Sequence, residues 1–392
     1  MKFIEKIFSI KNEKNYKIIT ILGLKLKIFS NKLANKLLVK RLEKYDVEVQ
    51  QLQKKNIKLE HEIGELKKAN SRSDYIHNKR FEQWLLTYRW LEFHSKLINK
   101  LIDFNNDEEL KKAQIKYLFK NIHKNEYLLD IDNPTSFNEK IQWLSLNYYS
   151  KNEEIHRIVD KYKFKEYIAE KLGDGYTIPL LGRWENVEEI NFETLPDKFV
   201  LKSNWGGDGR QIKIVEDKEK LNIEELKKQM KEWLSFDGYM YYYAFNGPSK
   251  GLKPCILAEN YVNGLGSKYY DYKIFCFNGK PQIIYVASNW AYEHKMSYYD
   301  TEWNKLDLVY SNYESFNKER PKNLDKMLDI ATELSKDFPF VRIDFFDLID
   351  KVVLSEMTYT PGGGFGMYKP LDWDYKLGEM LDISELIGSK NE

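Results

Sequence analysis

Apolar residues between positions 38 and 66 recur at alternating steps of four and three, the heptad spacing of a coiled coil. The two core positions are filled by Leu42, Val49, Asn56 and Ile63 at a, and by Tyr45, Leu52, Leu59 and Leu66 at d. Leucine at d, β-branched residues at a and one asparagine in the seam favour a parallel dimer in register. Oppositely charged flanking residues, such as Lys55 and Glu60, could pair between the chains. We therefore predict a homodimer through residues 31–70; the alternative is an amphipathic helix packed on its own domain.

Ahead of the coil, apolar and polar residues alternate on both sides of Gly23, over residues 17–28, which predicts a small β-hairpin within residues 1–30. The hairpin is rich in lysine, so it is either a peripheral membrane contact or a cap on the next helix. Charges at Lys2, Glu5 and Lys11 interrupt the apolar residues near the start, and we expect no secretory signal peptide. No uninterrupted apolar run approaches membrane-spanning length.

The segment Ser71-Arg72-Ser73 is expected to end the coiled coil. Large apolar residues then recur at helical spacing, which predicts a helical linker region over residues 71–130. These residues are Phe81, Trp84, Leu85, Tyr88, Leu91 and Leu101. We expect the rest of the chain, residues 131–392, to form the catalytic domain.

Two alternating apolar segments near the C-terminus, residues 341–346 and 354–359, read as strands of one hairpin. Ile343 and Phe345 flank Asp344, so the carboxylate should point away from both. Leu354 precedes Glu356 by two positions and is expected to share its face of the strand. The turn over residues 347–351 would bring Asp344 and Glu356 side by side.

Paired carboxylates on neighbouring strands are suitable ligands for Mg²⁺ that carries the phosphates of a nucleotide. Thr358 and the loop Pro361-Gly362-Gly363-Gly364 follow the second carboxylate. The plain alternative is that both acids are solvated strand residues.

A second candidate for phosphate binding lies upstream, where the apolar strand 198–202 ends in Lys202 and leads into a glycine-rich segment. Glycines at 206, 207 and 209 let backbone N–H groups turn inward and approach an anion closely, and the lysine adds a point charge. Residues 211–215 then read as a returning strand. A hairpin tip excludes the Walker P-loop and the dinucleotide fingerprint, because both need a helix there; the alternative is an ordinary turn.

The order of lysine strand, glycine-rich hairpin, aspartate strand and Glu-x-Thr before Pro-Gly resembles the ATP-grasp fold, and more narrowly its TupA-like branch. The motifs that carry the resemblance occur in order over about two thirds of the chain: residues 133–144, 160–162, 178–182, 195–202, 257–261 and 271–279, and the Asp344/Glu356 pair. The resemblance implies an α+β architecture, with an ATP-grasp domain that follows the N-terminal hairpin, the coiled coil and the helical segment.

The same resemblance implies roles for individual residues. ATP would be bound by Lys161, Lys202, Gly206, Gly207 and Gly209 at the phosphates, by Glu259 and Tyr261 at the adenine, and by Asp271 at the ribose. Mg²⁺ would be held by Asp344, Glu356 and Thr358, where threonine replaces the asparagine of the wider fold. Lys273, Lys295 and Arg342 are the candidate catalytic residues, and either Lys295 or Arg342 would neutralise the transferred phosphate. The structural alternatives are surface positions for Lys161 and Lys273, a simple Arg342–Asp344 pair, and a solvated strand end for Glu259.

ATP-grasp enzymes typically activate a carboxylate as an acyl phosphate, which an amine then attacks. The resemblance therefore implies an ADP-forming ligase that joins an amine to a sugar acid or polysaccharide precursor for the cell surface. A metal-dependent glycosyltransferase is the alternative, since Asp130-Ile131-Asp132 and Asp372-Trp373-Asp374 match the short Asp-x-Asp pattern. A coiled-coil scaffold with a degenerate ATP site is a third reading, which intact Lys202, Asp344 and Glu356 oppose.

Composition narrows these alternatives. With 392 residues the chain can hold two domains and an extension, and its net charge of +2 opposes a dedicated nucleic-acid binder. Cys255 and Cys276 are too far apart for a zinc knuckle, and so few cysteines favour a reducing compartment. We therefore expect a cytoplasmic protein, with the inner face of the membrane as the place where the N-terminus could make contact.

Overall fold

The computed structural model describes residues 8–13, 16–21, 24–29, 108–123, 127–206, 211–235, 246–262, 269–288, 295–348 and 351–390. The chain divides into two compact units, Met1–Leu101 and Ile102–Glu392. The predicted coiled coil over residues 31–70, most of the helical linker, Gly207 and Gly209 lie outside the described residues.

The described part of the first unit is a small antiparallel sheet in the order β1-β2-β3. Its strands are β1 (Phe8–Glu13), β2 (Tyr16–Ile21) and β3 (Leu24–Phe29). Ile21 pairs with Leu24, so β2 and β3 flank the turn that was predicted at Gly23, which itself lies outside the described residues.

One sheet of the second unit has the strand order β4-β7-β5-β6, with all neighbours antiparallel. Its strands are β4 (Leu180–Trp184), β5 (Phe199–Ser203), β6 (Ile212–Val215) and β7 (Ile256–Asn260). Helix α8 (Ile223–Leu234) packs Leu226, Met230 and Trp233 against Phe199 and Leu201 of β5. Because side chains alternate along a strand, Val200 and Lys202 lie on the opposite face of the sheet, away from α8.

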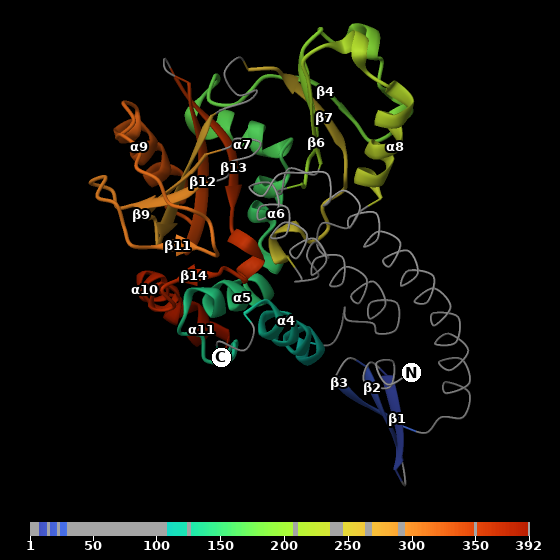
Figure 1. Cartoon of the computed structure of the whole chain (residues 1–392), viewed down its shortest axis with the longest axis vertical. Coiled ribbons are helices and arrows are strands. Elements are labelled where there is room, and N and C mark those ends of the chain that lie inside the picture. The colour runs from blue at the N-terminus through green and yellow to red at the C-terminus, as the bar shows by residue number, and fades with distance from the viewer. Residues whose placement is uncertain are drawn as a thin grey trace, which may run out of the picture. The chain divides into compact units, whose positions relative to one another are not determined.

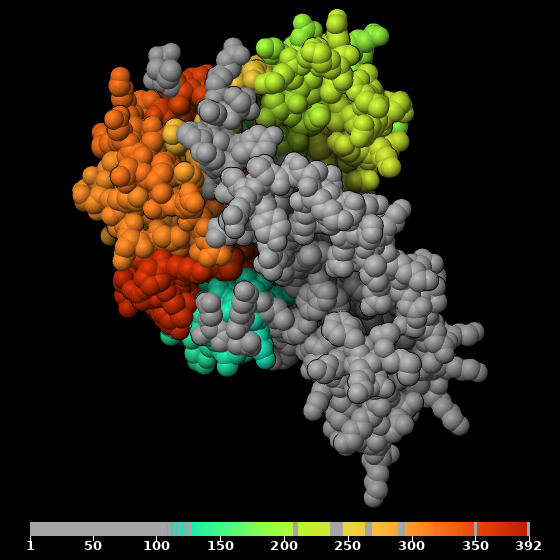
Figure 2. Space-filling model, viewed as in Figure 1, coloured from blue at the N-terminus to red at the C-terminus, as the bar shows by residue number. Residues whose placement is uncertain are grey.

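The other sheet of the second unit has the order β10-β9-β8-β12-β13 and is also antiparallel throughout. Its strands are β8 (Tyr270–Phe277), β9 (Lys280–Ser288), β10 (Met296–Tyr299), β12 (Phe340–Leu348) and β13 (Lys351–Thr358). Helix α9 (Leu324–Ser335) packs on β8, β9 and β12, and Figure 1 shows it beside this sheet. In Figure 2 the residues around the first sheet, green to yellow, and those around the second, mainly orange, form separate lobes.

Helices and a short ribbon complete the second unit (Figure 1). They are α4 (Glu108–Ile122), α5 (Phe137–Asn147), α6 (Glu153–Val159), α7 (Lys163–Leu172), α10 (Asp372–Met380) and α11 (Ser384–Lys390), and the ribbon of β11 (Val309–Tyr310) with β14 (Tyr368–Lys369). Helix α5 starts at a capping box, in which Ser136 accepts from the N–H of Glu139 and Glu139 accepts from the N–H of Ser136. Within the described residues, no helix is both long and apolar enough to cross a membrane.

The register of β12 and β13 confirms one sequence prediction and corrects another. Asp344 lies opposite Glu356, as the short turn predicted. Phe345 lies opposite Leu354, so the register shifts by one residue at Ser355. This β-bulge places Leu354 and Glu356 on opposite faces, and the prediction of a shared face was wrong. Leu354 can therefore be buried while Glu356 faces the site.

The close packing of α10 on the start of α5 gives a test of the fold. In Gly378→Ala, the added Cβ would lie 2.3 Å from the carbonyl oxygen of Thr135, and backbone can move out of the way only if a helix shifts. Overpacking of this kind costs about 1–3 kcal/mol, so the melting temperature followed by circular dichroism should fall. Gly388→Ala in α11 is the matched control, because its added Cβ meets nothing within 4 Å. Equal melting temperatures for the two variants would contradict the packing.

Candidate functional site

Charged side chains line up across three neighbouring strands of the second sheet. Lys273 on β8 lies opposite Asp344 on β12, and Asp344 lies opposite Glu356 on β13. Arg342 and Thr358 form the next cross-strand pair, two residues along each strand and hence on the same face. The register of the sheet therefore gathers two acids, two cations and a hydroxyl from separate parts of the sequence.

The carboxylate of Asp344 is almost fully buried, at 1% exposure, and both of its oxygens are paired with cations. The Arg342 guanidinium donates to both oxygens, at 2.6 Å from Nε and 2.7 Å from Nη2, and Lys273 Nζ lies 2.5 Å from Oδ2. Buried charges are tolerated only with such partners. The Arg342–Asp344 ion pair, which the sequence analysis gave as a structural alternative, is thus present.

Glu356 accepts from three groups around the same cluster. Arg342 Nη2 lies 3.0 Å from Oε1, the Thr358 hydroxyl donates to Oε1 over 3.2 Å, and Lys161 Nζ lies 3.3 Å from Oε2. Burial by itself raises the pKa of Glu356, but the positive charges of Lys161, Arg342 and Lys273 outweigh it and lower that pKa to about 2. Glu356 is therefore an anion at every pH of interest.

Glu259 on β7 is held between two lysines. Its side chain is buried, with Lys165 Nζ 2.6 Å from one oxygen and Lys202 Nζ 2.7 Å from the other. Burial raises the pKa of Glu259, while the charges of Lys202 and Lys165 lower it by more. The alternative of a solvated strand end is therefore wrong for this residue.

Lys165 was not predicted as a site residue from the sequence. It also donates to the carbonyl oxygen of Ile178 over 2.6 Å, which fixes it between α7 and the strand that follows. The available signal was its spacing, because it follows Lys161 by four positions and falls in the first turn of α7.

Lys161 links the two sheets. Its backbone N–H donates to Asn204 over 2.9 Å, and its ammonium donates to the carbonyl oxygen of Gly206 as well as facing Glu356. Gly206 follows β5, and an added Cβ there would lie 2.7 Å from Gln211 and 2.9 Å from the Ser203 hydroxyl. The start of the predicted phosphate loop is therefore tightly packed, and a side chain would not fit.

The remaining predicted residues lie at different distances from this cluster. Asp271 faces it, with an oxygen 3.6 Å from Lys273 Nζ, and burial together with the nearby acids raises the pKa of Asp271 against the opposing charge of Lys273. The Tyr261 hydroxyl instead donates to Glu216 over 3.0 Å, and Lys295 Nζ lies 3.6 Å from Glu314. The described contacts of Tyr261 and Lys295 are therefore with residues outside the cluster.

Two exposed isoleucines share the face of Lys202. Ile212 lies opposite Lys202 and Ile214 opposite Val200 across β5 and β6, and their exposures are 42% and 40%. On the second sheet, Phe346 follows Asp344 by two residues and shares its face. Phe346 is half-buried, whereas the two isoleucines are exposed, and exposed apolar side chains beside a charged residue commonly mark a ligand surface.

The donor set fits Mg²⁺ that arrives with a nucleotide. Within the described residues there is no group of three or more histidine, cysteine, aspartate or glutamate side chains arranged to hold a metal by themselves. Asp344, Glu356 and Thr358 offer two carboxylates and one hydroxyl. Mg²⁺ in nucleotide sites is usually held by one or two carboxylates together with substrate phosphates, so this set is suitable.

The two Asp-x-Asp segments are explained by local structure. Asp130 accepts from the N–H groups of Asp132 and Asn133, and Asp132 pairs with Lys112 at 2.6 Å. In the second segment, Asp372 pairs with Lys376 at 2.6 Å, and buried Asp374 accepts from the N–H of Asn138 at 3.0 Å. These contacts do not favour the metal site of a glycosyltransferase.

Comparison with protein-family models agrees with the ATP-grasp resemblance. The family model described as TupA-like ATPgrasp matches residues 139–382. Among solved structures, the D-alanine–D-alanine ligase from Helicobacter pylori is 16% identical over 57% of this chain and 61% of that one, with a TM-score of 0.32. The D-alanine–D-alanine ligase from Bacillus anthracis is 18% identical over 60% of this chain and 69% of that one, with a TM-score of 0.38. A search of curated proteins gives no match.

The structural similarities are loose, and the aligned part covers less than two thirds of the Helicobacter pylori ligase, at 61%. The assignment rests on the family model, because its match extends over more than half of the chain and includes the lysines, the paired acids and the glycines at 362–364. The chain therefore belongs to the TupA-like ATP-grasp family.

Proposed function

We propose that the protein is an ATP-dependent carboxylate–amine ligase that works through an acyl phosphate. The observation that carries the proposal is the row of Lys273, Asp344 and Glu356 across three strands, joined through Lys161 to the end of β5 beyond Lys202. This arrangement supports a polyphosphate held between the two sheets, with cations on both sides.

The nucleotide would lie along this junction. Lys161 and Lys202 would bind phosphates, and the backbone after β5 would approach them closely at Gly206. Ile212 and Ile214 on one sheet and Phe346 on the other would enclose the adenine. Asp271, which faces the cluster beside Lys273, is the acid that could accept from the ribose.

Charge neutralisation is the main chemical task of the site. Phosphoryl transfer needs its donor and acceptor aligned and the charge on the equatorial oxygens balanced. Arg342 is suited to this, since its guanidinium is already held by Asp344 on one side and by Glu356 and Thr358 on the other. Asp344, Glu356 and Thr358 would also hold Mg²⁺, which would have to displace part of these Arg342 contacts and would then neutralise further phosphate charge.

The reaction has two steps. A carboxylate oxygen of the substrate attacks the γ-phosphorus, the bond to the β-phosphate oxygen breaks, and ADP leaves. The amine nitrogen of the second substrate then attacks the acyl carbon, phosphate leaves with the C–O bonding electrons, and the nitrogen loses a proton to give the amide. No side-chain nucleophile is required, because phosphate is the leaving group.

We propose the substrates and the cellular process from the family resemblance, and not from the geometry of the site. We infer a sugar acid or polysaccharide precursor as the carboxylate and an amino acid or amine as the acceptor, in the synthesis of a cell-surface polymer. The N-terminal hairpin, the dimeric coiled coil, the cytoplasmic location and contact with the inner face of the membrane belong to the same proposal.

ATP binding through Lys202 can be tested directly. Lys202→Ala should weaken ATP binding at least tenfold by calorimetry, about 1.4 kcal/mol, because a phosphate partner is lost. Lys213→Ala is the control, since Lys213 lies on the adjacent strand opposite Leu201 and so faces the other side of the sheet. Equal affinities for the two variants would remove Lys202 from the site.

The paired acids should affect turnover more than binding. Asp344→Asn and Glu356→Gln keep side-chain shape but each loses an anionic oxygen, so ADP release should fall on the order of a hundredfold or more with a smaller change in ATP affinity. With the carboxylate substrate alone, hydroxylamine should trap the acyl phosphate in the wild type. Asp337→Asn, at an exposed position, is the control. Full activity in both acid variants, or consumption of a UDP-sugar with ATP untouched, would replace the ligase proposal.

The dimer proposal is tested on the full chain. We expect light scattering at micromolar concentration to give the mass of a dimer. Asn56→Leu should allow oligomeric states other than the dimer and raise the melting temperature. The reason is that a buried polar residue at position a limits the register and the oligomeric state at a cost in stability. A monomeric wild type would disprove the coiled-coil dimer.

A further inference from the structure

Helix α5 buries a stripe of polar residues where a core helix would normally bury apolar ones. Asn138, Gln142 and Ser145 are spaced by four and three positions, so they lie on one face, and they are 1%, 1% and 3% exposed. Buried polar side chains are nearly always hydrogen-bonded, and their partners show what they hold. The stripe falls partly in the family-like segment 133–144, to which the proposed chemistry assigns no role.

The partners are the backbones of two loops. Asn138 Oδ1 accepts from the N–H of Gly366 at 2.7 Å and its Nδ2 donates to the carbonyl oxygen of the same residue at 2.8 Å, as a neighbouring strand would. Gln142 Nε2 donates to the carbonyl oxygens of Gly363 at 2.7 Å and Gly364 at 3.2 Å. Ser145 Oγ accepts from the N–H of Gly247 at 3.0 Å.

Residues 361–366, called the glycine loop here, have a backbone that needs such support. Gly362, Gly363 and Gly364 all have positive φ, at 59°, 66° and 73°. Pro361–Gly364 form a single 3₁₀ turn with bonds from Gly363 to Thr360 and from Phe365 to Gly362, and residues 365–367 follow without regular structure. At Gly364 an added Cβ would lie 2.6 Å from Gln142 Nε2, so the loop sits directly against α5.

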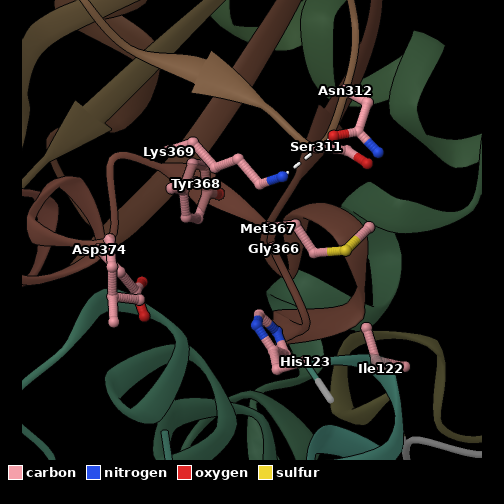
Figure 3. Close-up of a pocket in the computed structure, with 10 residues that line it drawn as sticks. Ile122, His123, Ser311, Asn312, Gly366, Met367, Tyr368, Lys369 and Asp374 are labelled. Atoms are coloured by element: carbon pink, nitrogen blue, oxygen red, sulfur yellow. Dashed lines mark hydrogen bonds between the residues drawn. The ribbon is translucent and has the colours of Figure 1, made fainter. Parts of the chain in front are cut away.

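The far end of the loop is held by apolar packing of buried Phe365 beside Phe119 and also by polar contacts. Gly366 and Met367 line a cavity of about 100 Å³ together with His123 and Asp374 (Figure 3). A space of this size has room for several water molecules. Gly366 is buried and is held in part by its hydrogen bonds to Asn138, which is itself fixed by Asp374 through bonds of 3.0 Å from both its backbone N–H and its Nδ2.

The glycine loop begins three residues after Thr358, so its shape determines what can approach the end of the charged row. Gly362 is exposed, and its backbone can come close to a ligand because it carries no side chain. We propose that Asn138 and Gln142 are positioning residues, which hold the glycine loop in the shape that seats the phosphoryl-accepting carboxylate. This inference rests on the proposed ligase function.

The test uses the full chain and two substitutions that keep side-chain volume but remove the hydrogen bonds, Gln142→Met and Asn138→Leu. The control is Gln229→Met, the same change on the exposed side of α8. We expect amide hydrogen exchange in a peptide over residues 359–367 to rise at least tenfold in the two variants, and exchange over residues 199–206 to stay at the wild-type rate. With hydroxylamine as the attacking amine, the KM for glucuronate, used as the carboxylate probe, should rise at least tenfold while the KM for ATP changes less than twofold.

The possible outcomes are distinct. Unchanged loop exchange in Gln142→Met, which is the milder variant should Asn138→Leu not fold, would overturn the support of the loop by α5. Faster loop exchange with equal changes in both KM values would show that Asn138 and Gln142 have a structural role only. It would overturn their proposed role in positioning the carboxylate substrate. If the wild type releases no ADP in response to glucuronate, galacturonate or glutamate, the ligase proposal fails and the assigned role fails with it, although the exchange data would still report on the loop.

Discussion

The pairing of buried carboxylates with cations is the constraint on which this site depends. An unpaired charge at the burial of Asp344 would cost several kcal/mol, so its position requires Arg342 and Lys273. Those cations are brought by the register of three strands, and Lys161 extends the same network to the other sheet. In the described cluster the acids are Asp271, Asp344, Glu356 and Glu259, and the cations are Lys161, Lys165, Lys202, Lys273 and Arg342. The excess of cations suits a site that receives a polyanion.

Much of this arrangement could be predicted from local sequence. A turn of a few residues fixes which positions of a hairpin face each other, so Asp344 could be paired with Glu356, and a lysine before glycines marks a loop that can approach phosphate. The β-bulge at Ser355 could not be predicted, because alternation along a strand is the only local signal and one extra residue reverses it. Lys165 was missed for a different reason, since its partner Glu259 lies far along the chain and only the tertiary fold joins them.

The polar stripe of α5 shows the same limit. A helix pattern normally indicates which face is buried through its apolar residues, and Asn138, Gln142 and Ser145 would be assigned to solvent by that rule. Their burial follows from loops that cannot satisfy their own backbone groups and need donors and acceptors from a neighbour. Thr360, whose hydroxyl donates to Asn246 over 2.8 Å, joins the two supported loops to each other. The helix thus acts as a rigid frame for irregular backbone near the site.

The ion pairs also bear on how a nucleotide would enter. Lys161 and Lys202 each already have a carboxylate partner, at Glu356 and Glu259 respectively, so a phosphate must compete with that partner for the ammonium group. A polyphosphate that reached both lysines could do so, because it carries several charges, whereas a single anion would gain one contact and lose one. As phosphates engage Lys161, Glu356 loses part of its compensation and becomes a better ligand for the cation that the nucleotide brings. Binding of the phosphates and binding of their metal would therefore reinforce each other, which selects for the complex of the two over either one alone.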